Sequence, residues 1–572
     1  MKKWTIQDKQ KKDSRKQSID EIIKTILKNR GLTDKKKIDK FLYPSLNDLM
    51  IESVGLKREE LDKTVIRIRK ARDNHDSVVV YTDYDADGIC AGAIVWETLY
   101  DLGLKVMPYV PHIEKEGYGL SKIGIDAIAK EFNPQLIITV DHGITSRKEI
   151  SYAKALGIET IVLDHHLIPQ ETPKAQALIH TTKLSAGGIA WFLADFLQRK
   201  LSGREGSEEE LKMHATRNLD LATLATVADL VPLFGANRVI VKFGLEVLNK
   251  TERVGLDALI QKSGLRKGEI GVYEVGHILA PRINAAGRLT HALDALRLIC
   301  TKDKDRASFL ADKLSLTNRE RQVLSEKSTS QAIEMVRHKF IYSDSSKKSM
   351  EKLIFVCHKE FKEGIIGLIA GKLVEEFYRP AIVVSQGENF SKASARSVAG
   401  FNIVEAIRKF PGLLEDVGGH PMAAGFTVAT KNLDQLKSEL QKIAHRELDE
   451  DKLIRTLTID TVLDLSDITK KLYDKLQQLA PYGIGNPEPV FASYQVKIVG
   501  ASLVGKDRKH LKMKIKDVNS NSVFEAIGFN MGEVFRKVTP HGLVDMAYTI
   551  AEDKWNGKNS LQLKLKDLRV NE

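Results

Sequence analysis

Acidic side chains crowd the end of one apolar run in this chain. The stretch Val78–Gly88 reads V-V-V-Y-T-D-Y-D-A-D-G and ends in Asp83, Asp85 and Asp87. Carboxylates this close repel one another unless a cation lies among them. If the run is a parallel strand, the cluster falls in the crevice at the carboxyl edge of the sheet, where ligands bind. The residues therefore predict a metal site built from oxygen ligands.

Two further strand-like runs end in similar residues. L-I-I-T-V-D-H-G contains Asp141 and His142, and T-I-V-L-D-H-H contains Asp164, His165 and His166. Three strands that end in mixed Asp and His ligands indicate a site for more than one metal ion. Each residue alone has a plainer interpretation, because an Asp after a strand is often a helix N-cap and a single His is often structural. Their occurrence together and in order favours the metal site.

The bulk composition is that of a globular protein. The chain has 572 residues, of which 42% are hydrophobic and 29% charged, and its length predicts three or four domains. No stretch approaches the roughly 20 apolar residues of a membrane span, and the first residues lack the apolar core of a secretory signal. Cys90, Cys300 and Cys357 are far apart, which argues against a disulfide framework and fits a reducing cytoplasm.

The net charge points to a polyanionic partner. It is +12, from 88 basic and 76 acidic residues. Nucleic acid is the first partner to consider for a basic protein. A soluble basic enzyme without such a partner is the alternative, and charge alone separates the two only weakly.

Sequence patterns divide the chain into five parts of an α/β protein. Polar, helical periodicity marks residues 1–75, and a long polar helix without Pro or Gly, followed by a linker, marks residues 303–345. This helix suits either a spacer between domains or one face of a bundle. A charged insert at Arg204–Lys212 is expected to be exposed. Residues 76–302 are predicted to form a parallel α/β domain that becomes mostly helical from residue 186. A second α/β domain is predicted at 346–452, and a small barrel such as an OB-fold at 453–572.

The ordered motifs resemble a known superfamily. D-Y-D-A-D-G, V-D-H-G, D-H-H and T-V-A-D-L, which contains Asp229, are similar to the DHH phosphoesterases. Five further motifs narrow the resemblance to the bacterial RecJ family and extend it over nearly the whole chain: E-G-Y-G-L, A-P-R-I-N-A-A-G-R-L, S-A-R-S, G-G-H-P-M-A-A-G and L-A-P-Y-G-I-G-N-P-E-P-V-F.

The resemblance implies a single-strand-specific 5′→3′ DNA exonuclease of recombination and repair that depends on two Mn²⁺ or Mg²⁺ ions. It implies a parallel-sheet DHH domain, a long connecting helix, a DHH-associated domain and an OB-fold-like barrel. Asp141 is the candidate to bridge both ions, and Asp83 and His166 are expected to act in catalysis as ligands or as groups that orient ligands, phosphate or water. The implied ligands are Asp85, Asp87, Asp141, His165 and Asp229.

The same resemblance implies a DNA-binding set. Arg282 and Arg288 are expected to flank a Gly/Ala-rich loop and to clamp phosphates, with structural ion pairing as the alternative. Tyr118 either stacks on a base or lies in the core. A loop after a strand in the second α/β domain is expected to bind the 5′ end, through Ser394, Arg396 and Ser397 with His420 nearby.

The last domain offers a possible platform for single strands. Basic residues alternate along an expected strand, and three aromatic residues can join them. For any one of the lysines, a solvated strand face is the plainer interpretation. The set is Lys506, Arg508, His510, Lys512 and Lys514, with Phe529, Tyr548 and Trp555.

Two positions depart from the RecJ pattern. His142 stands where Asn is usual, as a replacement donor or an extra ligand, and Ile113 stands where Arg is usual, with Lys115 as a substitute charge. Two other functions share the motifs: a DHH phosphodiesterase of short oligonucleotides or cyclic dinucleotides, and a DNA-binding scaffold that has lost its metals. The last domain argues against the first, and the complete carboxylate set argues against the second. We expect a monomer that works with single-strand-binding protein and a helicase, without a membrane partner.

Overall fold

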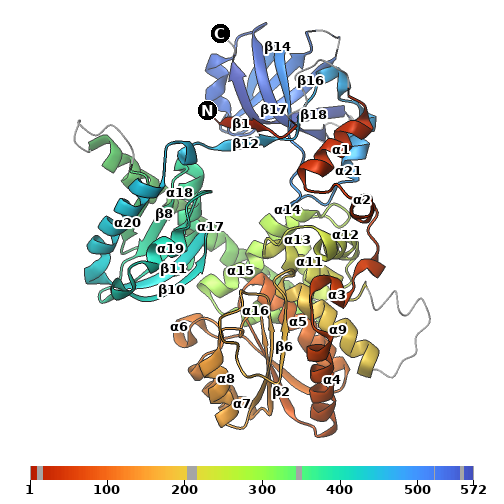
Figure 1. Ribbon diagram of the computed structural model, residues 1–572, viewed down its shortest axis with the longest axis vertical. Helices are drawn as coiled ribbons and strands as arrows, with labels where there is room; N and C mark the ends of the chain where they lie inside the picture. The colour runs from red at the N-terminus through yellow and green to blue at the C-terminus, as the bar shows by residue number, and fades with distance from the viewer. Residues whose placement is uncertain are drawn as a thin grey trace. The chain divides into compact units, whose positions relative to one another are not determined.

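A computed structural model describes residues 2–8, 17–201, 216–342, 351–518, 520, 522–553 and 560–570 (Figure 1). The insert Arg204–Lys212 and Trp555 lie outside the described residues, as does the side chain of Ile113. The chain divides into two compact units. The first unit contains residues 4–287, 291–315 and 458–572, and the second contains residues 1–3, 288–290 and 316–457.

A five-stranded parallel sheet forms the centre of one part of the first unit. Strands β2 (Ser77–Thr82) and β4 (Leu136–Val140) are buried along their whole length. Runs of Val and Ile buried on both faces are typical of a parallel sheet covered by helices. The predicted parallel α/β sheet is confirmed. In spatial order the strands are β3 (Lys105–Tyr109), β2, β4, β5 (Glu159–Asp164) and β6 (Ala177–His180).

Side chains of β2 alternate between two cores. Val78 and Val80 pack into one core, and Val79 and Tyr81 pack into the other, as the period of two along a strand requires. Helices cover both faces and leave the carboxyl edge of the sheet for a site. They are α4 (Arg58–Asp73), α5 (Ala86–Asp101) and α9 (Ala186–Leu201) on the first face, and α7 (Lys122–Phe132) and α8 (Arg147–Ala155) on the second.

The segment before residue 300 is mostly helical, as predicted, but one expected loop is wrong. Arg282 and Arg288 do not flank a loop, because A-P-R-I-N-A-A-G-R-L forms α15 (Ala280–Leu289). Pro281 lies in the first turn, where a missing N–H costs little, and Ile283 and three alanines are buried. The other helices are α11 (Leu219–Ala228), α12 (Gly235–Asn249), α13 (Val254–Lys262), α14 (Val272–Glu274), the π-helical η2 (Val275–Leu279) and α16 (Leu293–Cys300).

The predicted long helix is confirmed as α17 (Lys304–Tyr342). Ala307, Leu310 and Leu314 pack into the core of the parallel sheet. Ala332, further along, packs into a core of the second α/β domain. The helix therefore contributes to two cores and is more than a solvated spacer. None of the described helices is long and apolar enough to cross a membrane.

The second unit contains a mixed five-stranded sheet. Ser394 and Arg396 were expected on a loop, but they lie in β9 (Phe390–Arg396). This strand pairs on both sides, with Val383 and Gly425 opposite Ser394. In spatial order the strands are β10 (Leu414–His420), β11 (Ala423–Ala429), β9, β8 (Ala381–Ser385) and β7 (Ile354–His358), with helices α18 (Glu363–Phe377), α19 (Ile403–Arg408) and α20 (Leu433–Glu447).

The last residues form the predicted OB-fold-like barrel. Five strands follow one another by pairing, and the ring closes because β14 also pairs with β17. Closure leaves no free sheet edge among these strands. In pairing order they are β14 (Phe491–Val504), β15 (His510–Lys516), β16 (Val523–Gly528), β18 (Ser560–Val570) and β17 (Leu543–Asp553).

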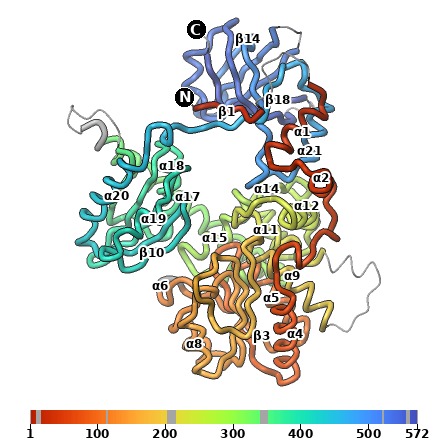
Figure 2. Tube along the Cα trace, in the orientation of Figure 1, coloured from red at the N-terminus to blue at the C-terminus, as the bar shows by residue number. Residues whose placement is uncertain are grey.

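Amino-terminal elements pack against this barrel. Ile22 and Ile26 of α1 (Ile19–Asn29) share its core with Leu472 of α21 (Lys470–Gln477), and α1 lies beside α21 in Figure 2. Helix α2 (Lys35–Leu42) adds Phe41 to the same core. An unpredicted strand, β1 (Lys3–Ile6), pairs with β12 (Thr456–Ile459) (Figure 1).

A buried arginine explains the motif L-A-P-Y-G-I-G-N-P. Arg238 of α12 is 1% exposed, and its guanidinium lies 3.8 Å from the ring centroid of Phe41. It donates hydrogen bonds to the carbonyls of Leu479 and Ala480, at 2.9 and 2.8 Å. Asn486, at the end of the turn, donates to the Leu479 carbonyl as well. A buried arginine satisfied by carbonyls fixes this turn against α12.

The expected basic and aromatic platform on the barrel is partly wrong. Tyr548 is 0% exposed, and its hydroxyl hydrogen-bonds to Ser493 Oγ at 2.7 Å inside the barrel. Lys506 and Arg508 precede β15 and do not alternate along it. Phe529 is 56% exposed and remains available to a ligand.

Candidate metal centre

The ends of three parallel strands bring the predicted acids and histidines to one edge. Asp83 follows β2, Asp141 follows β4, and Asp164 ends β5, with the two histidines directly after it. Neighbouring parallel strands end at the same edge of a sheet. Asp141 has the left-handed backbone angle φ of +68°, and its N–H donates to the Leu163 carbonyl at 2.9 Å. The chain thus turns sharply at the residue expected to bridge two ions.

Two helix N-termini hold the D-A-D-G carboxylates. Asp85 caps α5, where its Oδ1 accepts hydrogen bonds from the backbone N–H groups of Asp87 and Gly88. Asp87 in turn accepts from the N–H groups of Ala186 and Gly187, at 2.9 and 2.7 Å, in the first turn of α9. Helix N-termini favour negative charge. The caps therefore fix two predicted ligands without neutralising them.

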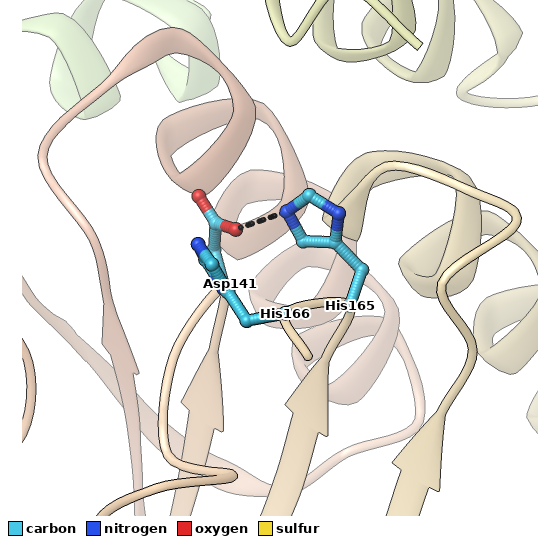
Figure 3. A group of neighbouring side chains, drawn as sticks. All are labelled: Asp141, His165 and His166. Carbon is cyan, nitrogen blue, oxygen red and sulfur yellow. Dashed lines mark ion pairs between the residues drawn. The ribbon is translucent and has the colours of Figure 1, made fainter. Parts of the chain in front are cut away.

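His165 lies among three of the predicted carboxylates. Its Nε2 is 3.1 Å from Asp141 Oδ1 and 3.8 Å from Asp87 Oδ2, and its Nδ1 is 3.6 Å from Asp229 Oδ2. Figure 3 shows the ring pointing toward Asp141. Asp229 comes from the end of α11, which brings a helical element to the edge formed by the strands.

Asp164 orients the histidine pair, a role that sequence reasoning did not assign. Its Oδ1 lies 2.8 Å from His166 Nδ1 and accepts from the N–H of His165 at 2.7 Å, while Oδ2 accepts from the N–H of Ile144 at 2.8 Å. Burial alone would raise the pKa of Asp164, but the hydrogen bonds hold it at about 2. An ionised carboxylate behind a histidine fixes its ring and tautomer.

The remaining acids repel one another in a buried space. Burial first, and then the charge of Asp85, raises the pKa of Asp83 to about 8 and that of Asp229 to about 7. Burial and the neighbouring carboxylates also raise the pKa values of Asp87 and Asp141 well above the ordinary range. Carboxylates in this state are stabilised by a bound cation.

The donor set fits Mn²⁺ or Mg²⁺. Two groups of side chains have candidate ligand atoms that lie within 4.8 Å of one another. One group contains Asp141, His165 and His166, and the other contains Asp87, His165 and Asp229. Asp141 Oδ1 is buried and accepts no hydrogen bond from the described residues. Carboxylates suit both ions, and imidazole favours Mn²⁺. Asp141 and His165 thus lie where the resemblance places ligands.

Three neighbours complete the edge. Asn284 of α15 accepts a hydrogen bond from the N–H of Ala86 at 2.6 Å and so holds the start of α5. Tyr118 is 60% exposed, so the alternative of a core tyrosine is wrong. His142 is buried with its ring edge-on to Tyr81, 5.3 Å between centroids, and burial lowers its pKa to about 4. His142 is in neither ligand group.

Three guanidinium groups lie close together in the second unit. Burial, and next the charge of Arg288, lowers the pKa values of Arg321 and Arg396. Among the described residues they donate to neutral acceptors: Arg288 to Gly364 O, Arg321 to Asn318 Oδ1 and Arg396 to Ala395 O. Like charges gathered beside neutral acceptors form a site for an anion. Arg321 was missed in the sequence because it lies in the long polar helix among many other charges.

The space beside Arg396 is open because α18 has a glycine there. A Cβ at Gly367 would lie 3.4 Å from Arg396 Nη2 and 3.1 Å from Ser394 Oγ. Ser397 differs from Ser394, because its buried hydroxyl donates to the Phe401 carbonyl at 2.6 Å. His420 is exposed at the end of β10. Arg282 is half-buried in the first unit and donates to the Ile278 carbonyl at 2.7 Å.

The fold and the centre define a metal-dependent phosphoesterase of the DHH class. Family models match three stretches of the chain: the N-terminal domain of the DHH family over residues 77–226, the DHHA1 domain over 350–446 and the RecJ OB domain over 459–567. The chain is 34% identical to the single-stranded-DNA-specific exonuclease RecJ of Bacillus subtilis, with 100% of this chain and 71% of that protein covered. It therefore belongs to the RecJ family.

Other relatives agree. The RecJ exonuclease of Thermus thermophilus is 32% identical over 86% of this chain and 68% of its own length. The crystal structure of the Thermus thermophilus RecJ in complex with Mn²⁺ has a TM-score of 0.79 and 27% identity, and the match covers 100% of this chain and 80% of that one. The same protein has also been solved with Mg²⁺. The chain is a metal-dependent nuclease by family and by site.

Gly187 is expected to tolerate no side chain. A Cβ there would lie 2.2 Å from Ala225 Cβ and 3.4 Å from Asp87 Oδ1. Gly187→Ala should destabilise the protein by about 1–3 kcal/mol, because packed interiors resist extra atoms, and should lower activity by displacing Asp87. The control Gly371→Ala, also in a helix but with nothing within 4 Å, should leave stability unchanged or improve it. Urea unfolding and nuclease rates test this, and equal behaviour of both variants would contradict it.

Metal removal should make stability depend on pH. In the folded state the pKa values of Asp83 and Asp229 are raised to about 8 and 7. Carboxyl groups whose pKa values are raised by folding stabilise the folded state below about pH 4. This contribution to stability is lost as the pH rises through about 7 and 8. The melting temperature in EDTA should therefore fall from pH 5 to pH 9. Added Mn²⁺ should raise it, and more at pH 8 than at pH 5, because protons compete with the ions.

The matched variants for this test are Asp141→Asn and Asp62→Asn. Asn at position 141 removes one of the repelling carboxylates, so the fall with pH should shrink. Asp62 is exposed on α4, and its variant should follow the wild type. A melting temperature in EDTA that rises between pH 5 and pH 9 would show that the carboxylates do not repel one another as described.

Proposed function

We propose that the protein is a single-stranded-DNA-specific exonuclease that hydrolyses phosphodiester bonds from the 5′ end in recombination and repair. The observation that carries the proposal is the carboxylate and imidazole cluster around His165. Family membership over the whole chain supports the substrate class, since the relatives are named single-stranded-DNA-specific exonucleases.

The roles follow from the positions of the side chains. When bound, two divalent ions would activate water and neutralise charge on the phosphate. We assign their binding to Asp85, Asp87, Asp141, His165 and Asp229, with Asp141 shared between them. Asp83 and His166 would hold a proton or orient water, because Asp164 fixes the His166 ring and the pKa of Asp83 is about 8 owing to its burial and Asp85.

Recognition of the 5′ end belongs to the guanidinium cluster. Arg288, Arg321 and Arg396 would bind a terminal phosphate, because a dianion relieves the repulsion among them and accepts several charge-assisted hydrogen bonds. Ser394 would add a hydroxyl donor. Tyr118 and Arg282 would contact the strand in the first unit, while the roles predicted for Ser397 and His420 find less support in their positions.

The wider assignment rests on the same family relation. We propose that the ranges 76–302, 346–452 and 453–572 serve catalysis, end binding and strand binding. A monomer that works in the cytoplasm with single-strand-binding protein and a helicase is proposed as well. None of the three cysteines forms a disulfide, which supports a reducing compartment.

The first functional test is removal of the shared ligand. Asp141→Asn should reduce nucleotide release by more than about 100-fold, since loss even of groups that only orient ligands costs 10–100-fold. Asp62→Asn is the control and should keep full activity. The assay is a product time-course on 5′- and 3′-labelled single strands and duplexes with Mn²⁺ or Mg²⁺.

The time-course also separates the alternatives. A 5′-labelled single strand should yield labelled mononucleotide at once, and the duplex should stay intact. Cleavage of dinucleotides or cyclic dinucleotides alone would favour the small-substrate phosphodiesterase. Tight binding of an intact strand in Mn²⁺ would favour a non-catalytic scaffold.

The end-binding assignment has its own test. Arg321→Ala and Arg396→Ala should each lower kcat/KM for a 5′-phosphorylated strand by about 10–100-fold, as loss of a hydrogen bond to a charged group does. The effect on a 5′-hydroxyl strand should be much smaller. Arg337→Ala is the control, because Arg337 lies on the same helix in an exposed ion pair with Glu376 at 2.6 Å. Equal losses on both substrates would contradict the assignment.

A further inference from the structure

An exposed aromatic pair stands out in the first unit. Tyr273 of α14 is 63% exposed, and the ring of His277 in η2 stacks on it with centroids 4.5 Å apart and planes inclined by 15°. His277 is exposed as well. Its Nδ1 lies 3.3 Å from the Tyr273 carbonyl, which keeps the two rings together. Two parallel rings thus form one flat surface open to solvent.

The backbone beneath the pair is firmly held. The side chain of Glu274 accepts a hydrogen bond from the N–H of Gly271 at 2.9 Å, and Val275 and Leu279 are buried. Residues 275–279 form a π-helical turn, which is rare in proteins and frequent at functional sites. An aromatic contact one turn apart on a helix contributes little stability. Stability alone therefore gives little reason to hold two rings in solvent here.

The segment that carries the pair packs against α11, the helix that ends at Asp229. A Cβ at Gly276, beside His277, would lie 3.5 Å from Val227 Cγ1, and Val227 is two residues before Asp229. Leu230, the residue after Asp229, is 64% exposed with a φ of +59°. An apolar side chain directly after this ligand is thus open to solvent.

The turn before the barrel extends the same surface. The N–H of Leu233 donates to the Ile484 carbonyl at 2.8 Å, and a Cβ at Gly483 would lie 3.6 Å from Val272 Cγ1. Ile484 is 49% exposed. We call Leu230, Tyr273, His277 and Ile484 the stacking patch. The segments that carry these residues are linked by these contacts, and Leu230 directly follows Asp229 in the chain.

We infer that Tyr273 and His277 stack on a base of the bound single strand. This inference rests on the proposed function and adds a positioning site to it. Every base has a flat π-face, so aromatic stacking is strong and tolerates any sequence. In a duplex the bases already stack on one another, so such a patch selects for unpaired strands. The packing of η2 on α11, which ends at Asp229, argues for the substrate itself as the occupant rather than for a second protein.

The test combines variants with abasic substrates. The quantity is kcat/KM for release of the first nucleotide from a 5′-phosphorylated single strand with Mn²⁺, with one base at a time replaced by an abasic unit. For the wild-type enzyme, an abasic unit at one particular position should lower kcat/KM by about 10-fold. Tyr273→Ala should show this loss on the intact strand and no further loss at that position. Tyr273→Phe should behave as the wild type.

Tyr100→Ala is the matched control. Tyr100 is 60% exposed and stacks on Trp96 with centroids 5.5 Å apart, at the far end of α5 from the metal centre. It should change nothing. His277→Ala serves as a second variant if Tyr273→Ala folds poorly, and it should give a similar pattern.

Two results would overturn the inference. One is a Tyr273→Ala enzyme that matches Tyr100→Ala on every substrate, as expected if another protein covers the patch. The other is a loss that is equal at all abasic positions, as expected of a structural role. Failure of the wild type to cut any single strand is a different result, which rejects the proposed function instead.

Discussion

Repulsion among buried carboxylates is the constraint on which the rest of this structure depends. Asp83, Asp87, Asp141 and Asp229 gather at the edge of a parallel sheet, and burial together with their neighbours' charges raises their pKa values. A fold tolerates such a cluster only if other interactions hold the groups in place. The N–H groups at the start of α9 do so for Asp87. Small residues allow the close approach that these bonds need.

The same constraint separates two kinds of carboxylate. Asp164 is as buried as Asp83, Asp87 and Asp141, yet four hydrogen bonds keep its pKa at about 2 against the effect of burial. It is therefore an ionised group with its oxygens already occupied. Asp141 has an oxygen that accepts no hydrogen bond from the described residues. The number of hydrogen bonds that its oxygens accept therefore distinguishes a carboxylate that orients a histidine from one that is available to a cation.

Features that a local sequence pattern determines could be predicted. Features that depend on contacts between residues far apart in the chain could not. Strand ends and their Asp and His residues follow from apolar runs, and the structure confirms the parallel sheet, the long helix and the barrel. The helix over 280–289 was read as a loop because Gly and Ala dominate it, although burial of Ile283 stabilises the helix. Tyr548 appeared available until the barrel closed around it. Neither the orienting role of Asp164 nor the proximity of Arg321 to Arg288 leaves a signal in spacing.

Charge clusters carry more information than net charge. A surplus of 12 positive charges spread over a surface needs no partner, since solvent screens it. Like charges that are gathered and partly buried repel one another more strongly than charges spread over the surface, because solvent screens them less. In the guanidinium cluster the acceptors named above within the described residues are neutral, so these charges are available to an anion. The carboxylate cluster has the opposite charge, and by the same argument bound cations stabilise it. Each cluster taken by itself therefore favours a ligand of opposite charge: a phosphate for the guanidinium groups and divalent cations for the carboxylates.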